Sequence, residues 1–235
     1  MFSLLMQLNK HDKSRLTEYL KQFVSEKRKK RFEEVLSERT AHIRLLLEDI
    51  YQGHNAAAVL RSCDCFGIQH IHFMQDRNQV KISEEIAMGS TSWLSVHKHN
   101  GAEESVIDVI RNLKKEGYRI VATTPHENDQ EISKLPVDKK MVLVFGTEID
   151  GISNAVLEEA DEFVKIPMYG FTESFNISVS AALCLYELSG RMRREVKDYH
   201  LSEEEKEELY LDWTIKSIET GPLLVERWKK ENVNV

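Results

Sequence analysis

Three short stretches of the chain place polar side chains shortly after apolar segments that are typical of buried strands. They are "HNAAAVLR" (54–61), "FGTEIDG" (145–151) and "IPMYGFTESFNISV" (166–179). Their polar members include Asn55, Arg61, Glu148, Ser174 and Asn176. In an open α/β sheet, ligands bind outside the carboxyl ends of the strands, where glycines let the backbone approach a ligand closely. The stretches together predict a binding site, although each alone also fits a helix cap, a tight turn or a solvated arginine.

The common signatures of nucleotide and metal enzymes are missing. The chain has no G-x-G-x-x-G, no Walker P-loop and no H-E-x-x-H. His70 and His72 lie two residues apart on a predicted strand, which is more typical of a plain sheet face than of metal ligands. Three cysteines give neither a disulfide framework nor a metal quartet. We therefore expect no metal cofactor, and a dehydrogenase or a metal hydrolase is disfavoured.

Composition indicates an ordinary soluble protein. The 235 residues are 41% hydrophobic and 30% charged, and no apolar run approaches the roughly 20 residues that span a bilayer. The cysteine usage and the absence of a signal-peptide pattern favour the cytoplasm and no membrane association.

Charge is distributed unevenly along the chain. The formal net charge is −7, but the first 50 residues carry +3 and the remaining 185 carry −10. The basic run "KRKKR", Lys27 to Arg31, fits either a solvated helix face or an arm that contacts phosphates.

Apolar segments alternate with helical patterns through most of the chain. We expect strands over 42–50, 68–74, 91–99, 118–124, 141–146 and 163–168. Helices are expected over 56–67, 102–117, 153–160 and 176–194. This alternation predicts an α/β fold with a mainly parallel sheet that is covered by helices on both faces.

Three segments organise the chain. Residues 1–40 are predicted to form an N-terminal helical extension, 41–194 the main domain and 195–235 a C-terminal helical extension. The last of these should contain one helix that begins at Ser202, with Glu205 completing a capping box. After the Gly221-Pro222 break we expect a loosely attached tail.

In this order, the three stretches resemble the three motifs of the SPOUT-class (SpoU/TrmH) RNA ribose 2′-O-methyltransferases. The resemblance covers residues 42–190 most strongly, and the flanking segments are similar to the tRNA guanosine-18 branch of that family. It implies methyl transfer from S-adenosylmethionine to a tRNA ribose, at guanosine 18 of the D-loop. The same chemistry on ribosomal RNA or at another tRNA position stays open, as does a non-catalytic RNA-binding knot protein.

The resemblance also implies features that periodicity and composition do not indicate. One is a deep trefoil knot in the C-terminal part of the sheet, since true knots are almost absent from proteins. Another is a homodimer whose interface includes the knotted region.

The resemblance assigns roles to individual residues. It places Arg61 at the ribose, where it either accepts the hydroxyl proton or orients a phosphate and stabilises developing charge. The other residues implied in catalysis are Asn55, Glu148, Ser174 and Asn176. Those implied at the methyl donor are Thr123, Gly146, Ile166, Met168 and Phe175. Phe175 departs from the usual Leu of the motif, and Ser180 departs from a common Ala. Candidate tRNA contacts are Lys27, Arg28, Lys29, Lys30, Arg31, Arg191, Arg193 and Arg194.

Overall fold

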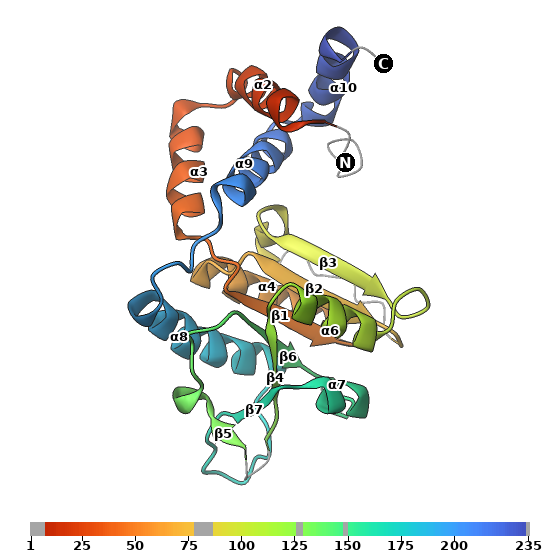
Figure 1. Cartoon of the computed structure of the whole chain (residues 1–235), viewed down its shortest axis with the longest axis vertical. Coiled ribbons are helices and arrows are strands. Elements are labelled where there is room, and N and C mark those ends of the chain that lie inside the picture. The colour runs from red at the N-terminus through yellow and green to blue at the C-terminus, as the bar shows by residue number, and fades with distance from the viewer. Residues whose placement is uncertain (1–7, 78–86, 126–128, 148–149, 234–235) are drawn as a thin grey trace. The chain divides into compact units, whose positions relative to one another are not determined.

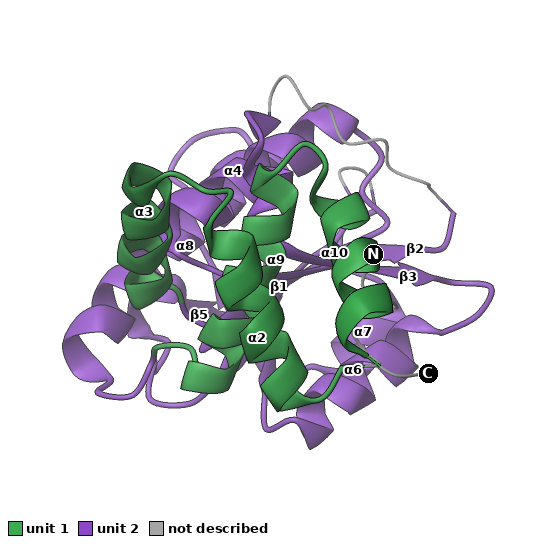
Figure 2. Cartoon of the chain, turned by 90° about the horizontal axis from the view of Figure 1, so that it is seen from above, with its two compact units in different colours: residues 1–39, 200–235 green, residues 40–199 purple. Residues whose placement is uncertain are grey.

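The computed structural model of the chain describes residues 8–77, 87–125, 129–147 and 150–233 (Figure 1). Contacts divide the chain into two compact units (Figure 2). One unit is residues 40–199, and the other combines residues 1–39 with 200–235. The two terminal segments therefore belong to the same unit.

Within the described residues, the larger unit contains one seven-stranded sheet in which every pairing is parallel. The strand order is β3-β2-β1-β6-β4-β7-β5. The strands are β1 (Ile43–Glu48), β2 (His70–Gln75), β3 (Ser95–Asn100), β4 (Arg119–Thr123), β5 (Gln130–Glu131), β6 (Met141–Phe145) and β7 (Glu162–Lys165). The predicted parallel α/β sheet is confirmed.

Helices cover both faces of this sheet (Figure 1). Helices α4 (Gly53–Phe66) and α8 (Ile177–Glu195) pack against each other and share one apolar core with the strands. Helices α6 (Val106–Lys115) and α7 (Asn154–Glu159) contribute to the core on the other face. Successive strand residues supply both cores, as Leu45 and Leu46 do on β1, because side chains alternate across a sheet.

Two helices begin at other residues than predicted. Helix α6 begins after Ser105, whose Oγ accepts from the Asp108 amide, and not at the acidic residues before it. Helix α4 begins at Gly53, so Asn55 lies inside its first turn and does not cap it. Gly67 ends α4 in the left-handed conformation, with φ of 76°, as the sequence predicts.

Most strands are shorter than predicted, and the ends of two of them show why. Residues 90–92 form a 3₁₀ turn (η1, Ser90–Ser92), so β3 begins only at Ser95. Strand β7 ends at Lys165, two residues before Pro167. Proline has no backbone N–H to donate to a neighbouring strand, which makes it a poor residue for continuing the ladder.

The smaller unit contains α2 (Lys10–Lys21), α3 (Glu26–Glu38), α9 (Glu203–Ser217) and α10 (Gly221–Asn232). The predicted capping box of Ser202 and Glu205 is confirmed. The predicted loose tail after Gly221 is wrong, because these residues form α10. Val225 and Trp228 of α10 are buried with Leu16 and Leu20 of α2. Burying a tryptophan side chain stabilises such a helix against its neighbours.

Candidate active site

Four neighbouring strands bring the three polar stretches to one edge of the sheet. In the order β1-β6-β4-β7, the first stretch follows β1, the second follows β6 and the third follows β7. Thr123 ends the remaining strand, β4. All four strands run in the same direction, so their carboxyl ends meet at this edge.

A direct hydrogen bond joins the first stretch to the third. Asn176 caps α8 by accepting from the Ser178 amide at 2.9 Å through Oδ1. Its Nδ2 donates to Oδ1 of Asn55 at 3.1 Å. Asn55 is only 3% exposed and donates in turn to Gln52 Oε1 at 3.1 Å. Both amides are therefore fixed in orientation, since each uses its oxygen and its nitrogen at once.

Arg61 and Ser174 are exposed, unlike Asn55. Arg61 lies further along α4, and in the described part of the chain it makes no hydrogen bond or ion pair. Its guanidinium can therefore meet a phosphate or a ribose without first breaking an internal contact. Ser174 lies two residues before the cap of α8, so Asn176 alone performs the capping that both residues could have supplied.

The second stretch forms a tight turn that only glycine permits. Thr147 and Gly151 exchange two backbone hydrogen bonds, of 2.8 and 3.2 Å. A Cβ atom on Gly146 would lie 2.1 Å from the carbonyl oxygen of Gly151, and Gly151 itself has φ of 71°. Glu148 lies outside the described residues.

The residues implied at the methyl donor lie around the ends of β4, β6 and β7. The Thr123 hydroxyl donates to the Val144 carbonyl at 2.8 Å, which fixes its side chain between two strands. Ile166 is partly buried against the main core and Met168 is half-buried, while Phe175 is 41% exposed. Gly146 adds bare backbone to this apolar surface. The set therefore offers backbone and apolar atoms to a ligand.

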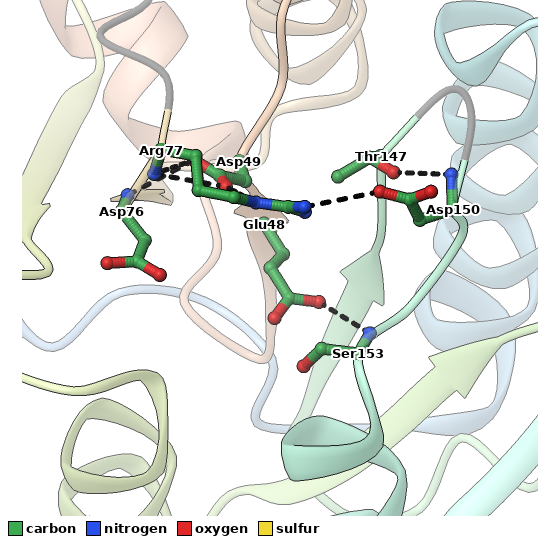
Figure 3. Close-up of polar contacts among 7 residues, drawn as sticks. All are labelled: Glu48, Asp49, Asp76, Arg77, Thr147, Asp150 and Ser153. Carbon is green, nitrogen blue, oxygen red and sulfur yellow. Dashed lines mark hydrogen bonds and ion pairs between the residues drawn. The ribbon is translucent and has the colours of Figure 1, made fainter.

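An ion-pair bridge at the same edge was missed by the sequence reasoning (Figure 3). Asp49, the residue after β1, binds Arg77 after β2, and Arg77 reaches Asp150 in the second stretch. Glu48 accepts from the Ser153 amide at 3.0 Å beside this bridge. The only sequence signal is that Asp49 lies near the end of one predicted strand, 42–50, and that Arg77 follows another, 68–74, by three residues.

The basic residues predicted to contact RNA differ in whether they already form ion pairs with described residues. On α3, Lys27, Arg28 and Lys30 are exposed and make no ion pair within the described residues. Lys29 and Arg31 pair along the helix with Glu26 and Glu34, at 2.6 and 3.5 Å.

The arginines at the end of α8 show the same contrast. Arg191 donates to Glu195 Oε1 at 3.3 Å and to the Ser133 carbonyl at 2.8 Å. Arg193 lies over the Tyr199 ring, 5.3 Å from its centroid. Arg194 is exposed, with no hydrogen bond or ion pair to any described residue.

Two further observations concern the described residues alone. They contain no group of three or more His, Cys, Asp or Glu side chains arranged to hold a metal ion. They also contain no helix with the length and apolar character that a bilayer crossing requires.

Comparisons with known proteins concern both the sequence and the fold of the chain. The SpoU rRNA Methylase family matches residues 42–186. A tRNA (guanosine(18)-2′-O)-methyltransferase of Borreliella burgdorferi is 39% identical over 194 residues, covering 83% of this chain and 87% of that protein. The crystal structure of the Aquifex aeolicus TrmH/SpoU tRNA modifying enzyme matches with a TM-score of 0.75 and 30% identity, over 82% of this chain and 98% of that one. An AdoMet-bound rRNA methyltransferase of Sinorhizobium meliloti shares the fold at 22% identity, with a TM-score of 0.57 over 68% of this chain and 59% of that one. The chain belongs to the SpoU methylase family.

Proposed function

We propose that the protein transfers a methyl group from S-adenosylmethionine to the ribose 2′-hydroxyl of guanosine 18 in tRNA. The Borreliella burgdorferi relative, 39% identical, is named for this reaction. The observation that carries the proposal is the Asn55–Asn176 hydrogen bond of 3.1 Å, which ties the first motif to the third, while Arg61 is exposed six residues further along the helix of Asn55.

A ribose hydroxyl is a weak nucleophile, so the site must position it and remove its proton. Arg61 is free to bind the ribose or the adjoining phosphate, because no described residue occupies its guanidinium. Arginine normally stays protonated, which favours a role in orienting phosphate and stabilising charge. A role as proton acceptor requires a substrate phosphate to assist it. The Asn55–Asn176 pair would hold the start of α4, the helix that carries Arg61, against the start of α8.

The strand ends fit S-adenosylmethionine, which supplies an electrophilic methyl group when bound. Gly146 leaves the backbone bare where any side chain would collide with Gly151. Apolar surface comes from Ile166, Met168 and Phe175. Phe175 is 41% exposed, so its ring, which is larger than the usual Leu side chain, fits at this position. The Sinorhizobium meliloti rRNA methyltransferase, which shares this fold, has AdoMet bound in its crystal structure, and this supports the same donor here.

Binding of tRNA would use basic residues that are not already paired. Lys27, Arg28 and Lys30 on α3 and Arg194 on α8 meet this condition among the described residues. Arg191 is a weaker candidate, because binding a phosphate would cost its contacts to Glu195 and Ser133. Since tRNA is the proposed substrate, we place the activity in the cytoplasm.

A homodimer is the proposed assembly. Val179, Leu183 and Tyr186 are exposed at spacings of four and three residues on α8, so they form one apolar helix face next to Phe175.

We further propose the trefoil knot. The packing of α8 on the 3₁₀ turn η2 (Ile132–Lys134), within the connection from β4 to β6, supports such a path.

The RNA class can be tested directly. The protein is incubated with tritiated S-adenosylmethionine and one of two RNA preparations, total tRNA or ribosomal RNA. Both preparations lack ribose methylation. We expect label in the tRNA fraction only. Label confined to ribosomal RNA would replace the proposal with the alternative that the family name suggests, and no label in either would favour a non-catalytic RNA-binding protein.

A further inference from the structure

Asp49 is a buried carboxylate that ties the end of β1 to the end of β2. It is 3% exposed and has φ of 54°, an uncommon conformation for a residue other than glycine. Its Oδ1 accepts from the amides of Asp76 and Arg77 at 3.1 and 2.9 Å. Its Oδ2 accepts from Arg77 Nε at 2.9 Å. The carboxylate is therefore charged and fixed by several donors, as a buried ion must be.

The anchored Arg77 continues this contact into the second motif (Figure 3). With Nε held by Asp49, its Nη1 lies 3.3 Å from Asp150 Oδ2. The Asp150 amide donates to Thr147 Oγ1 at 2.8 Å, within the turn that Thr147 and Gly151 close. Arg77 thus links two parts of the site. One is Asp49, which lies between β1 and Asn55, and the other is the second-motif turn, whose sequence contains Glu148.

We propose that Arg77 is a positioning residue for methyl transfer, which holds the second-motif turn in register with the start of the first-motif loop. This inference rests on the proposed function. Arg77 and Asp150 are 62% and 64% exposed at their side chains, and exposed ion pairs contribute little to stability. Misplacement of a reacting group by about 1 Å can nevertheless cost about 100-fold in rate. Asp49 keeps its two backbone amide donors in an Arg77 variant, so losing the exposed contact to Asp150 should affect turnover much more than folding.

The test replaces Arg77 by Lys in the full-length protein. Lysine keeps the charge, but a single ammonium cannot reproduce the fork that contacts both carboxylates. We expect kcat on a tRNA transcript to fall at least about tenfold, which corresponds to about 1.4 kcal/mol. The KM for tRNA, the Kd for S-adenosylhomocysteine and the Tm should stay close to wild type.

A second variant, at the carboxylate of Asp150, checks that Arg77 acts through this residue. Asp150→Asn should lower kcat by a similar factor, and the double variant should be no slower than either single variant, because residues of one bridge are not additive. Arg111 provides a matched control. Its side chain is 61% exposed and pairs with Glu159 at 2.7 Å, on α6 and α7. Arg111→Lys should leave kcat unchanged.

Hydrogen exchange gives a readout that does not depend on activity. In Arg77→Lys, exchange in peptides spanning the Thr147–Gly151 turn should be faster than in wild type, and unchanged in Arg111→Lys. Wild-type kcat or unchanged exchange in Arg77→Lys would overturn the proposal. If the wild-type protein itself transfers no methyl to tRNA, the proposed function fails, and the exchange result alone then supports or overturns the bridge.

Discussion

Asn55 and Arg61 lie on the same helix six residues apart, yet their surroundings differ sharply. Asn55 is buried and its amide is hydrogen-bonded to Gln52 and Asn176, whereas Arg61 is exposed and makes no hydrogen bond or ion pair with a described residue. A buried, paired amide suits a structural support, and an unoccupied cation suits contact with a charged substrate. This difference separates the residues that build the site from those that act on RNA.

Replacing Arg61 by Ala should abolish methyl transfer without affecting the fold. No internal contact is lost among the described residues, so the Tm and the Kd for S-adenosylhomocysteine should match wild type. We expect kcat/KM for tRNA to fall at least about 100-fold, on the scale of one lost charge-stabilising group. A filter assay of methyl incorporation into tRNA measures kcat/KM, and calorimetry measures the Kd and the Tm. An active Arg61→Ala protein would remove Arg61 from the mechanism.

Gly146→Ala should damage the proposed donor site. The added Cβ would lie 2.1 Å from the Gly151 carbonyl oxygen and 2.3 Å from the Ile152 nitrogen, so the turn must open. Calorimetry should show binding of S-adenosylhomocysteine weakened at least about tenfold. Gly190→Ala is a matched control, since its Cβ meets only the flexible end of Arg194 at 3.5 Å. Equal binding by both variants would place the donor elsewhere.

The sequence predicts most of the site residues but not the contacts that they make. Asn55 was expected to cap α4, and the structure instead turns it toward Asn176, which is 121 residues later in the chain. Asp49 and Arg77 were missed because their bridge joins three loops that are separated by 28 and 73 residues. Spacing along one segment predicts a cap, but only the assembled strand order brings distant loops together.

At the scale of elements, α8 combines a buried face with an apolar face that is left exposed. Ala181, Leu185 and Leu188 are buried in the main core, while Val179, Leu183 and Tyr186 are exposed. Small residues on the buried side allow close packing against α4. The exposed side has no comparable reason to be apolar in a monomer.

Leu183→Glu should therefore dissociate the proposed dimer. Leu183 is 40% exposed, so a charge there is tolerated in the isolated chain but opposes burial against a second copy. Light scattering after size-exclusion chromatography should give a dimer mass for wild type and a monomer mass for the variant. A wild-type monomer, or a variant that stays dimeric, would exclude this helix face as the interface.

Strands β2 and β3 place four histidines together on one face of the sheet. His72 stacks on His97 with ring centroids 4.4 Å apart, and His70 Nδ1 lies 3.1 Å from His97 Nε2. Burial, with smaller contributions from Arg44 and the neighbouring rings, lowers the pKa of His72 to about 2 and of His70 to about 3. Burial likewise lowers the pKa of His97 to about 4. All three are neutral in the folded protein near pH 7.

Acid should consequently destabilise the fold over a defined range. Below about pH 6.5 the unfolded chain protonates these imidazoles while the folded protein does not, so the free energy of unfolding falls as pH falls toward about 4. Each histidine contributes up to about 1.4 kcal/mol per pH unit. Urea unfolding between pH 7 and 4.5 should show a shallower dependence for His97→Gln than for wild type or for the control His11→Gln, which changes an exposed histidine. Equal slopes in all three proteins would contradict this account.

For the whole molecule, the sequence predicted the parallel sheet and the edge at which the motifs meet. Buried strands such as β1 and β6 are nearly continuous apolar runs, which makes them recognisable without a partner. The grouping of α2, α3, α9 and α10 into one unit could not be predicted in the same way. The apolar face of an amphipathic helix indicates that the helix packs on something, but it does not identify the partner. The sequence therefore predicts a loose tail where the structure buries Trp228.

The most direct test of the central claim maps the methyl group itself. An unmodified tRNA transcript is incubated with S-adenosylmethionine and the full-length protein, digested, and analysed by mass spectrometry of the ribose-methylated fragments. We expect one added methyl on the fragment containing guanosine 18, and none when Arg61→Ala protein is used or when position 18 is adenosine. A methyl group on another nucleotide, or none with the wild-type protein, would contradict it.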